Sequence, residues 1–202
     1  MTTVEVGGAG LERLNRLLHD VPGGVWKAAY GALKRAGEAA KTQAGRFAAE
    51  EYTIRKSDFM KNVTVKTSIG NESGRGDVTA VNGAAAGGVV SLNIRYAGNV
   101  LPLLAFDTHF GRNGRLRVQV KRLGDSKPLN RAFAARVFDR MGVFEREGDA
   151  RFPVRQLYGP STAHMMRNER VVEKMDATIR ETYEKRIDHE IDRVLNGWGG
   201  RT

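Results

Sequence analysis

The chain has 202 residues, of which 41% are apolar and 28% charged, a composition typical of a folded chain rather than a disordered one. This length is enough to bury a hydrophobic core, so we expect a single domain over residues 1–202. The chain contains no cysteine, which excludes disulfides, thiol nucleophiles and cysteine-ligated metal or iron–sulfur sites. No apolar run approaches the ~18 residues of a membrane span, and the first residues lack the pattern of a secretory signal.

The positive charge is concentrated in one part of the chain. Lys and Arg outnumber Asp and Glu by 33 to 23, a net charge of +10, and residues 111–160 alone carry 12 basic and 5 acidic side chains, a net +7. A localised basic surface is typical of proteins that contact nucleic acid or an acidic protein face. The alternative is a solvated basic surface that has no partner.

The first quarter of the chain predicts two helices. Apolar residues recur at helical spacing from Leu11 to Val21, and Pro22-Gly23-Gly24 ends this pattern, so residues 1–24 form an arm and a short helix. A second helix is predicted over residues 25–52. Its apolar stripe is mostly alanine, and such small side chains let a helix lie close to a neighbouring helix or sheet.

Residues 53–160 predict the β-sheet region. After a short helical turn capped at Ser57-Asp58, apolar and polar residues alternate with period two, which indicates half-buried antiparallel strands. The predicted strands are 63–69, 90–96, 116–120, 141–146 and 152–154. Residues 131–138 fit either a helix or a strand, and residues 70–88, with six glycines, predict a flexible loop. Pro153 favours a sheet edge for the last strand.

The closing helix, predicted over residues 161–197, has the clearest pattern. Seven apolar side chains recur three or four residues apart: Val172, Met175, Ile179, Tyr183, Ile187, Ile191 and Val194. Ser161 is the predicted N-cap and Gly197 the C-terminal stop. At 1.5 Å per residue a helix over 162–195 would be about 51 Å long. That is too long for a compact body of this size, so the helix either breaks near Asn168 or reaches a neighbouring subunit.

Together these elements predict an α+β fold. We expect an antiparallel sheet of about four to five strands, packed by a long N-terminal helix region and a long C-terminal helix.

The sequence predicts no catalytic, cofactor or metal site. The four histidines lack metal-ligand spacing, no GxSxG elbow is present, and Gly7-Gly8-Ala9-Gly10 has Arg13 where a dinucleotide loop needs its third glycine. Asp107 and His109 lie near a predicted loop, but two polar groups without a third do not form a catalytic constellation. We therefore expect a protein that is not an enzyme and binds no cofactor.

The basic segment predicts one candidate interface. Three cations share the polar side of one predicted strand and two share that of another: Arg115, Arg117, Lys121, Arg151 and Arg155. If both strands belong to one sheet, the five form a single face that would bind an acidic partner or the phosphates of DNA. No aromatic residue is interleaved with these cations, which argues against a platform for stacking single-stranded bases.

Residues 141–161 resemble the signature of the phage and prophage minor tail protein Z family, which is itself similar to the tail-completion proteins of tailed phages. The matching segments are MGVFER at 141–146 and RFPVRQLYGPS at 151–161. The signature positions include Phe144, Arg146, Tyr158 and Pro160. Further similarity extends over residues 25–197. Whether the signature residues build the fold or an interface is left open by the sequence.

The resemblance implies a structural virion protein at the head-proximal end of a phage tail, which completes the tail and joins it to the head. Implied partners are further copies of the chain in a ring of six, the tail tube or tail terminator, the head connector and the end of the genomic DNA. Neither a membrane nor a small-molecule substrate is expected. The protein would be assembled in the bacterial host cytoplasm and located in the virion. The alternatives are a basic nucleic-acid-binding protein that acts outside a virion, and a hydrolase with an unrecognised site.

Overall fold

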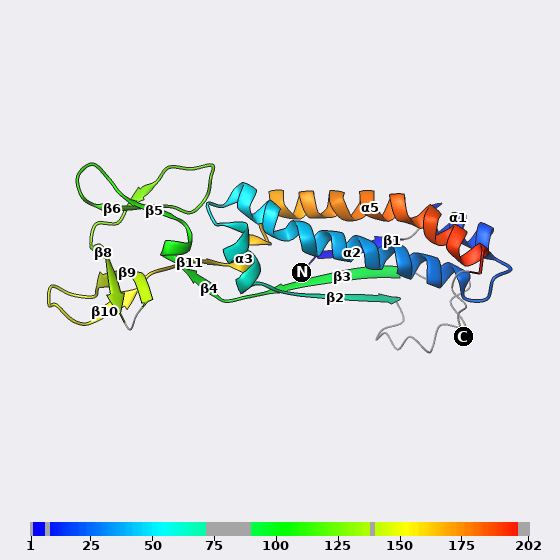
Figure 1. The fold of residues 1–202 in the computed structure, drawn as a ribbon, viewed down its shortest axis with the longest axis horizontal. Helices are drawn as coiled ribbons and strands as arrows, with labels where there is room; N and C mark the ends of the chain where they lie inside the picture. Colours follow the sequence, from blue (N-terminus) through cyan, green and yellow to red (C-terminus); the bar gives the residue numbers. More distant parts are fainter. Residues whose placement is uncertain (1, 7–8, 72–89, 138–139, 198–202) are drawn as a thin grey trace. The chain divides into compact units, whose positions relative to one another are not determined.

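The computed structural model describes residues 2–6, 9–71, 90–137 and 140–197, which fall into two compact units (Figure 1). We call residues 1–43, 65–95 and 173–202 the helical unit, and residues 44–64 and 96–172 the strand-rich unit.

The helical unit is built on α1 (Ala9–Leu18) and on most of α2 (Gly24–Glu51) and α5 (Glu169–Leu195). The alanine stripe of α2 is completely buried, as are Leu14 and Leu18 of α1 and Leu33 of α2. Each buried alanine contributes little apolar area, but it keeps the helix backbone close to its neighbours on more than one side.

The sheet of the helical unit has the strand order β1 (Thr2–Val6), β3 (Val90–Ala97), β2 (Thr64–Asn71). β1 and β3 are antiparallel, with Val4 opposite Leu92. On β3, Val90, Leu92 and Ile94 are buried and alternate with more exposed polar residues, as the period-two pattern predicts. Gly37 of α2 lies against this face, where a Cβ atom would sit 3.3 Å from Leu92 Cδ1.

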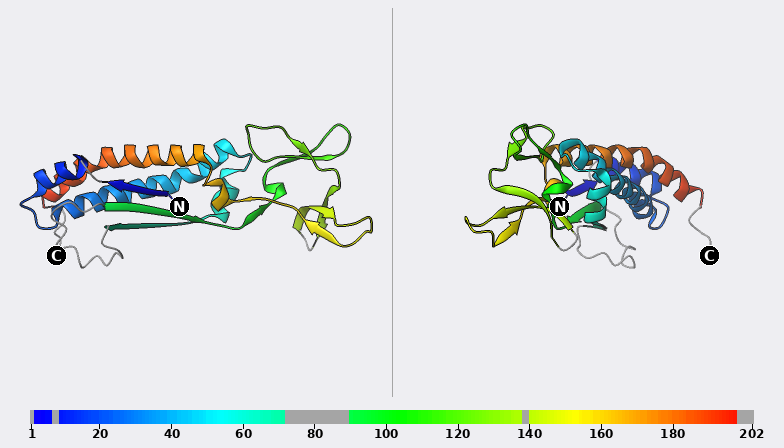
Figure 2. Two further views of the ribbon diagram at one scale, coloured as in Figure 1. Left: turned by 180° about the vertical axis from the view of Figure 1, so that it is seen from behind. Right: turned by 60° about the vertical axis from the view of Figure 1, so that its left-hand side comes forward.

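A second side of α2 contacts α5. A Cβ atom at Gly24 would lie 3.2 Å from Val194 Cγ1, and one at Gly31 would lie 2.7 Å from Glu190 Oε2. Figure 1 and the reverse view in Figure 2 both draw α2 between α5 and the strands of this unit. The small residues of α2 therefore serve two close contacts, one with a sheet and one with a helix.

The strand-rich unit contains short elements. In chain order they are α3 (Lys56–Asn62), β4 (Val100–Pro102), the 3₁₀ turn η2 (Leu103–Ala105), β5 (Asp107–Phe110), β6 (Leu116–Gln119), β7 (Lys127–Pro128), β8 (Ala132–Val137), β9 (Arg140–Arg146), β10 (Val154–Gln156), β11 (Tyr158–Ser161) and α4 (Thr162–Met165). They form three antiparallel sheets with the orders β5–β6–β7, β10–β9–β8 and β11–β4. Thr162 Oγ1 donates to Asn62 O at 3.1 Å and ties the start of α4 to the end of α3.

The predicted closing helix is broken, which is one of the two alternatives that the sequence left open. Ser161 Oγ accepts the His164 N–H at 3.1 Å and caps α4, which confirms the predicted N-cap. The helix stops at Met165, and Asn168 Oδ1 accepts the Arg170 N–H at 3.1 Å where α5 begins. The break near Asn168 is therefore confirmed.

The apolar stripe of α5 differs from the prediction in detail. Met175, Ile179 and Ile191 are buried, whereas Tyr183 and Ile187 are only half-buried. Val171, which the pattern omits, is buried, and so is the charged residue Glu190. The buried face is therefore wider than an apolar stripe alone indicates, because a flanking helix also covers polar positions next to it.

The α+β class is confirmed, with a long helix toward each end of the chain. The strands of the described residues are distributed over several small sheets rather than one sheet of four to five strands. The reason is local pairing: β5 pairs with β6 and β9 with β10 as hairpins, and alternation in a sequence does not say which strands are partners.

The structure also bears on three predicted segments: residues 131–138, the short helix near Ser57 and the loop over 70–88. Residues 131–138, ambiguous in the sequence, contain the strand β8. The short helix α3 begins at Lys56 with Arg55 as N-cap and no side-chain cap bond, so the predicted Ser57-Asp58 cap is wrong. Of the predicted loop over 70–88, Gly70 belongs to β2, and residues 72–88 lie outside the described residues.

Candidate functional site

The positive charge of the chain belongs mainly to the strand-rich unit. Its sequence carries 18 Lys and Arg against 10 Asp and Glu, a net +8, whereas the helical unit carries 15 against 13, a net +2. An anionic partner is therefore attracted mainly to the strand-rich unit.

The β5–β6 hairpin carries much of this charge. His109 is opposite Arg117 and Asp107 is opposite Gln119, so these four side chains share one face of the hairpin. On the other face Thr108 is opposite Val118, and Phe110 is opposite Leu116. Leu116 and Val118 are buried, which makes the Arg117 face the outer one.

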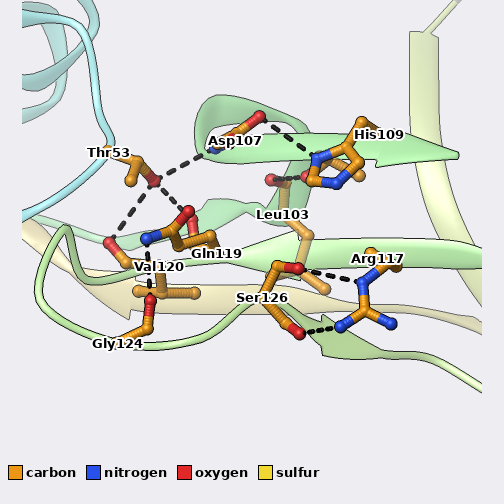
Figure 3. Close-up of polar contacts among 10 residues, drawn as sticks. Thr53, Leu103, Asp107, His109, Arg117, Gln119, Val120, Gly124 and Ser126 are labelled. Carbon is orange, nitrogen blue, oxygen red and sulfur yellow. Dashed lines mark hydrogen bonds and ion pairs between the residues drawn. The ribbon is translucent and has the colours of Figure 1, made fainter. Parts of the chain in front are cut away.

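Thr53, which follows α2, holds this hairpin from the side. Thr53 Oγ1 donates to the Gln119 and Val120 carbonyl oxygens and accepts the Asp107 N–H at 3.1 Å (Figure 3). The Thr53 backbone N–H also donates to Val120 O at 3.0 Å. A single residue thus connects the start of β5 with the end of β6.

Two side chains of β6 fix the connection to β7. Arg117 Nε donates to Ser126 Oγ at 2.9 Å, and Arg117 Nη2 donates to Ser126 O. Gln119 Nε2 donates to Gly124 O at 2.8 Å (Figure 3). It also donates to Arg122 O at 3.1 Å. The backbone of the β6–β7 loop is therefore held by side-chain donors from the strand that precedes it.

Asp107 and His109, noted in the sequence as an isolated polar pair, do contact each other. His109 Nδ1 lies 3.4 Å from Asp107 Oδ1, and both side chains are about half exposed. Thr108, which lies between them in the sequence and points to the other face, donates from Oγ1 to Leu103 O at 2.8 Å. With Nδ1 directed at the carboxylate, Nε2 is the nitrogen that His109 offers to a ligand.

An open hollow of about 520 Å³ lies at the hairpin turn. Its lining residues are His109, Phe110, Gly111, Arg112, Asn113 and Arg117. The turn is closed by Gly111 N–H donating to Arg115 O at 2.8 Å, and Gly114 adopts a positive φ of 72° that favours glycine. The Phe110 side chain is 65% exposed, although it belongs to the inner-facing set of the hairpin, because the turn extends beyond the buried strand face.

The five predicted interface cations do not lie on one sheet. Arg117 lies within β6, with Arg115 just before this strand and Lys121 just after it. Arg155 lies on β10, with Arg151 before that strand, and β10 belongs to a different sheet from β6. The premise of a single five-residue face is therefore wrong.

Two of the five cations have partners within the unit. Lys121 pairs with Tyr52 in an isolated bridge, and Arg155 forms an ion pair with Glu145, 2.7 Å from Nη2 to Oε2. The hydrogen bond to Glu145 raises the pKa of Arg155.

The signature residues have different roles. Phe144 of β9 is buried against Phe133, with ring centroids 6.2 Å apart, and the Arg146 guanidinium lies 5.4 Å from the centroid of the Phe133 ring. These two residues build the β8–β9 sheet. Tyr158 is 51% exposed, and its hydroxyl donates to Gln156 Oε1 at 2.9 Å. Pro160 is half-buried on β11.

Sequence reasoning missed Phe110, Arg112 and Thr53. A signal for the first two existed, because His109-Phe110-Gly111-Arg112-Asn113-Gly114 places an aromatic and a cation in a glycine-flanked turn between two alternating segments. Nothing local marked Thr53, whose partners Gln119 and Val120 are more than sixty residues away in the chain.

Within the residues that the structure describes, no group of three or more His, Cys, Asp or Glu side chains is placed to hold a metal ion. In the same part of the chain no helix is long and apolar enough to cross a membrane. No protein-family model matches the chain, nor does any curated protein or solved structure.

Proposed function

We propose that this chain is a structural subunit of a phage virion, which acts at the head-proximal end of the tail, completes it and joins it to the head. The observation that carries the proposal concerns residues 141–161, the segment that resembles the minor tail protein Z family. This segment exposes large apolar side chains, while several of its polar groups are already paired within the unit.

The exposed side chains are those of Met141, Phe152 and Tyr158, which are 50%, 67% and 51% accessible. Aromatic residues and methionine are enriched at protein–protein interfaces, and burying the exposed half or more of each side chain in a contact is favourable by about 1–2 kcal/mol. These residues account for one third of the nine large apolar side chains that are exposed in the described part of the chain.

Charge pairing in the same segment supports a protein partner. Arg155 is bound to Glu145, and Arg131 Nη2 lies 2.9 Å from Asp149 Oδ1 in the turn between β9 and β10. An internally balanced surface with protruding aromatic groups can be covered by another protein without leaving many charges unpaired. The partners we propose are further copies of the chain in a ring of six, the tail tube or tail terminator, and the head connector.

A ring contact is heterologous, because each copy uses one patch toward its left neighbour and a different patch toward its right neighbour. Such a contact closes at one rotation angle only. The tail end would therefore act as the template for assembly, and the role is structural, with no catalytic step.

The proposal is tested by complementation of a phage or prophage that lacks this gene. The test variant is Phe152→Ser with Tyr158→Ser, and the control is Leu17→Ser with Leu195→Ser, which removes two equally exposed apolar side chains of the helical unit. Both proteins should fold, with melting temperatures close to that of the wild type. We expect the control to restore particles in which heads and tails are joined, and the test variant to leave separate heads and tails. Full restoration by the test variant contradicts the proposal.

A further inference from the structure

We propose that the β5–β6 hairpin is a binding site for single-stranded nucleic acid, in which Phe110 stacks on a base and Arg112 and Arg115 contact phosphates. This inference does not depend on the proposed function, because it concerns a different surface and is tested on the isolated protein.

The cations of this hairpin are not neutralised. Among the residues that the structure describes, Arg112, Arg115 and Arg117 have no carboxylate within 4.0 Å, unlike Arg131 and Arg155 in the neighbouring sheet. Arg115 Nη1 donates to the neutral side-chain amide oxygen of Asn130 at 3.4 Å. Unpaired arginines on one turn attract phosphates, and each phosphate contact releases counterions.

Phe110 lies at the strand end next to the turn that carries these cations. The sequence pattern argued against base stacking because no aromatic residue alternates with the basic ones along the strands. The hairpin nevertheless supplies an aromatic residue from a different strand. The exposed Phe110, at the end of β5, lines the same hollow as Arg112 and Arg117. An aromatic face beside arginines is the combination that binds unpaired bases, whereas the bases of a duplex are already stacked on each other.

The site is held ready for binding. Arg117 is fixed by two bonds to Ser126, and its side chain lies across Gly111, where a Cβ atom would be 2.9 Å from Arg117 Cδ. Asn113 Oδ1 accepts the Arg115 N–H at 3.2 Å within the turn. The backbone of the turn is therefore ordered before binding, which limits the loop entropy that binding costs.

An acidic protein is the competing partner for the same cations. Its carboxylates would pair with the arginines but would leave the flat face of Phe110 without a matching group. The exposed ring therefore favours a nucleic-acid strand over an acidic peptide.

The experiment measures binding to a fluorescein-labelled oligothymidylate of twelve nucleotides by anisotropy, at several salt concentrations. The test variants are Phe110→Ala and Arg112→Ala. Their controls are Leu195→Ala and Arg186→Ala, an exposed apolar residue and an exposed arginine of the helical unit. Unlabelled oligothymidylate, a duplex of equal length and a polyglutamate peptide serve as competitors.

We expect Phe110→Ala to weaken binding about tenfold, as the loss of one stacked base does, while Leu195→Ala changes it less than twofold. Arg112→Ala should lower the slope of log affinity against log salt by about 0.7, and Arg186→Ala should not. Oligothymidylate should be a better competitor than the duplex or the peptide. The proposal is wrong if the wild type does not bind the labelled strand, if Phe110→Ala binds it as well as the wild type, or if polyglutamate or the duplex competes as strongly as oligothymidylate.

Discussion

The Glu190 carboxylate of α5 lies against Gly31 of α2, and a Cβ atom at Gly31 would be only 2.7 Å from Glu190 Oε2. Glu190 is 6% exposed, and Arg193 Nη1, one turn later on the same helix, lies 3.5 Å from Glu190 Oε2. A buried carboxylate thus occupies the space that the absent side chain of Gly31 leaves. The packing of α2 on α5 therefore includes this pair as well as the buried alanines.

Because of this contact, the effect of Gly31→Ala on the free energy of unfolding should depend on the side chain at position 190. Alanine in a helix is normally more stable than glycine by about 1 kcal/mol. In the wild-type background the new methyl group meets Glu190, so we expect Gly31→Ala to destabilise the protein. In a Glu190→Ala background it should stabilise the protein. Chemical denaturation of the four proteins gives the coupling free energy, which should be about 1 kcal/mol or more. Additive effects would show that the two residues do not interact.

Tyr183 provides a second test on α5. Its hydroxyl is buried and has no hydrogen-bond partner among the described residues. An unpaired buried hydroxyl is unfavourable by about 1–3 kcal/mol, so Tyr183→Phe should raise the free energy of unfolding by about 1 kcal/mol at neutral pH. Equilibrium unfolding in urea measures this. A loss of stability instead would mean that the hydroxyl has a partner.

The same residue predicts a pH dependence. Burial raises the pKa of Tyr183 to about 12, whereas a tyrosine in an unfolded chain titrates near pH 10. The unfolded state therefore loses this proton first as the pH rises, so the free energy of unfolding is highest with respect to this titration below pH 10 and falls between about pH 10 and 12. Tyr183→Phe removes this loss, so its stability advantage over the wild type should grow across that range. A constant difference would contradict the assigned burial.

Ile179 tests the buried face of the closing helix. It is completely buried, whereas Ile187 is only half-buried and His189 is exposed. A carboxylate at position 179 would enter an apolar contact, so Ile179→Asp should cost about 3 kcal/mol or more. Ile187→Asp should cost less, and His189→Asp should have little effect. Thermal melting of the three variants gives the order. Equal melting temperatures for Ile179→Asp and the wild type would exclude this helix face from the core.

Thr53 tests how the strand-rich unit is held together. Thr53→Val keeps the shape of the side chain but removes the hydroxyl that bonds to β6 and to the Asp107 N–H, and we expect a cost of about 1–3 kcal/mol. Thr53→Ser should keep most of the stability. If valine is tolerated as well as serine, the hydroxyl contacts do not contribute.

The sequence predicted what depends on local periodicity. The helix α2, the strand β3 and the Ser161 cap were all visible as patterns of neighbouring residues. What it missed depends on partners that are distant in the chain. No local pattern indicated that β6 and β10 belong to different sheets, or that Glu190 fits beside Gly31. Nor did any pattern indicate that Phe110 shares a hollow with Arg112 and Arg117.

The central claim is that this chain is a structural component of the head-proximal end of a phage tail. Electron cryomicroscopy of particles made with and without the gene tests it most directly. We predict a discrete ring of this subunit at the tail end that faces the head, with residues 141–161 in contact with a neighbouring chain, and unjoined tails when the gene is absent. Particles that are complete without the gene, or a subunit found only at the distal tip or outside the particle, would contradict the account.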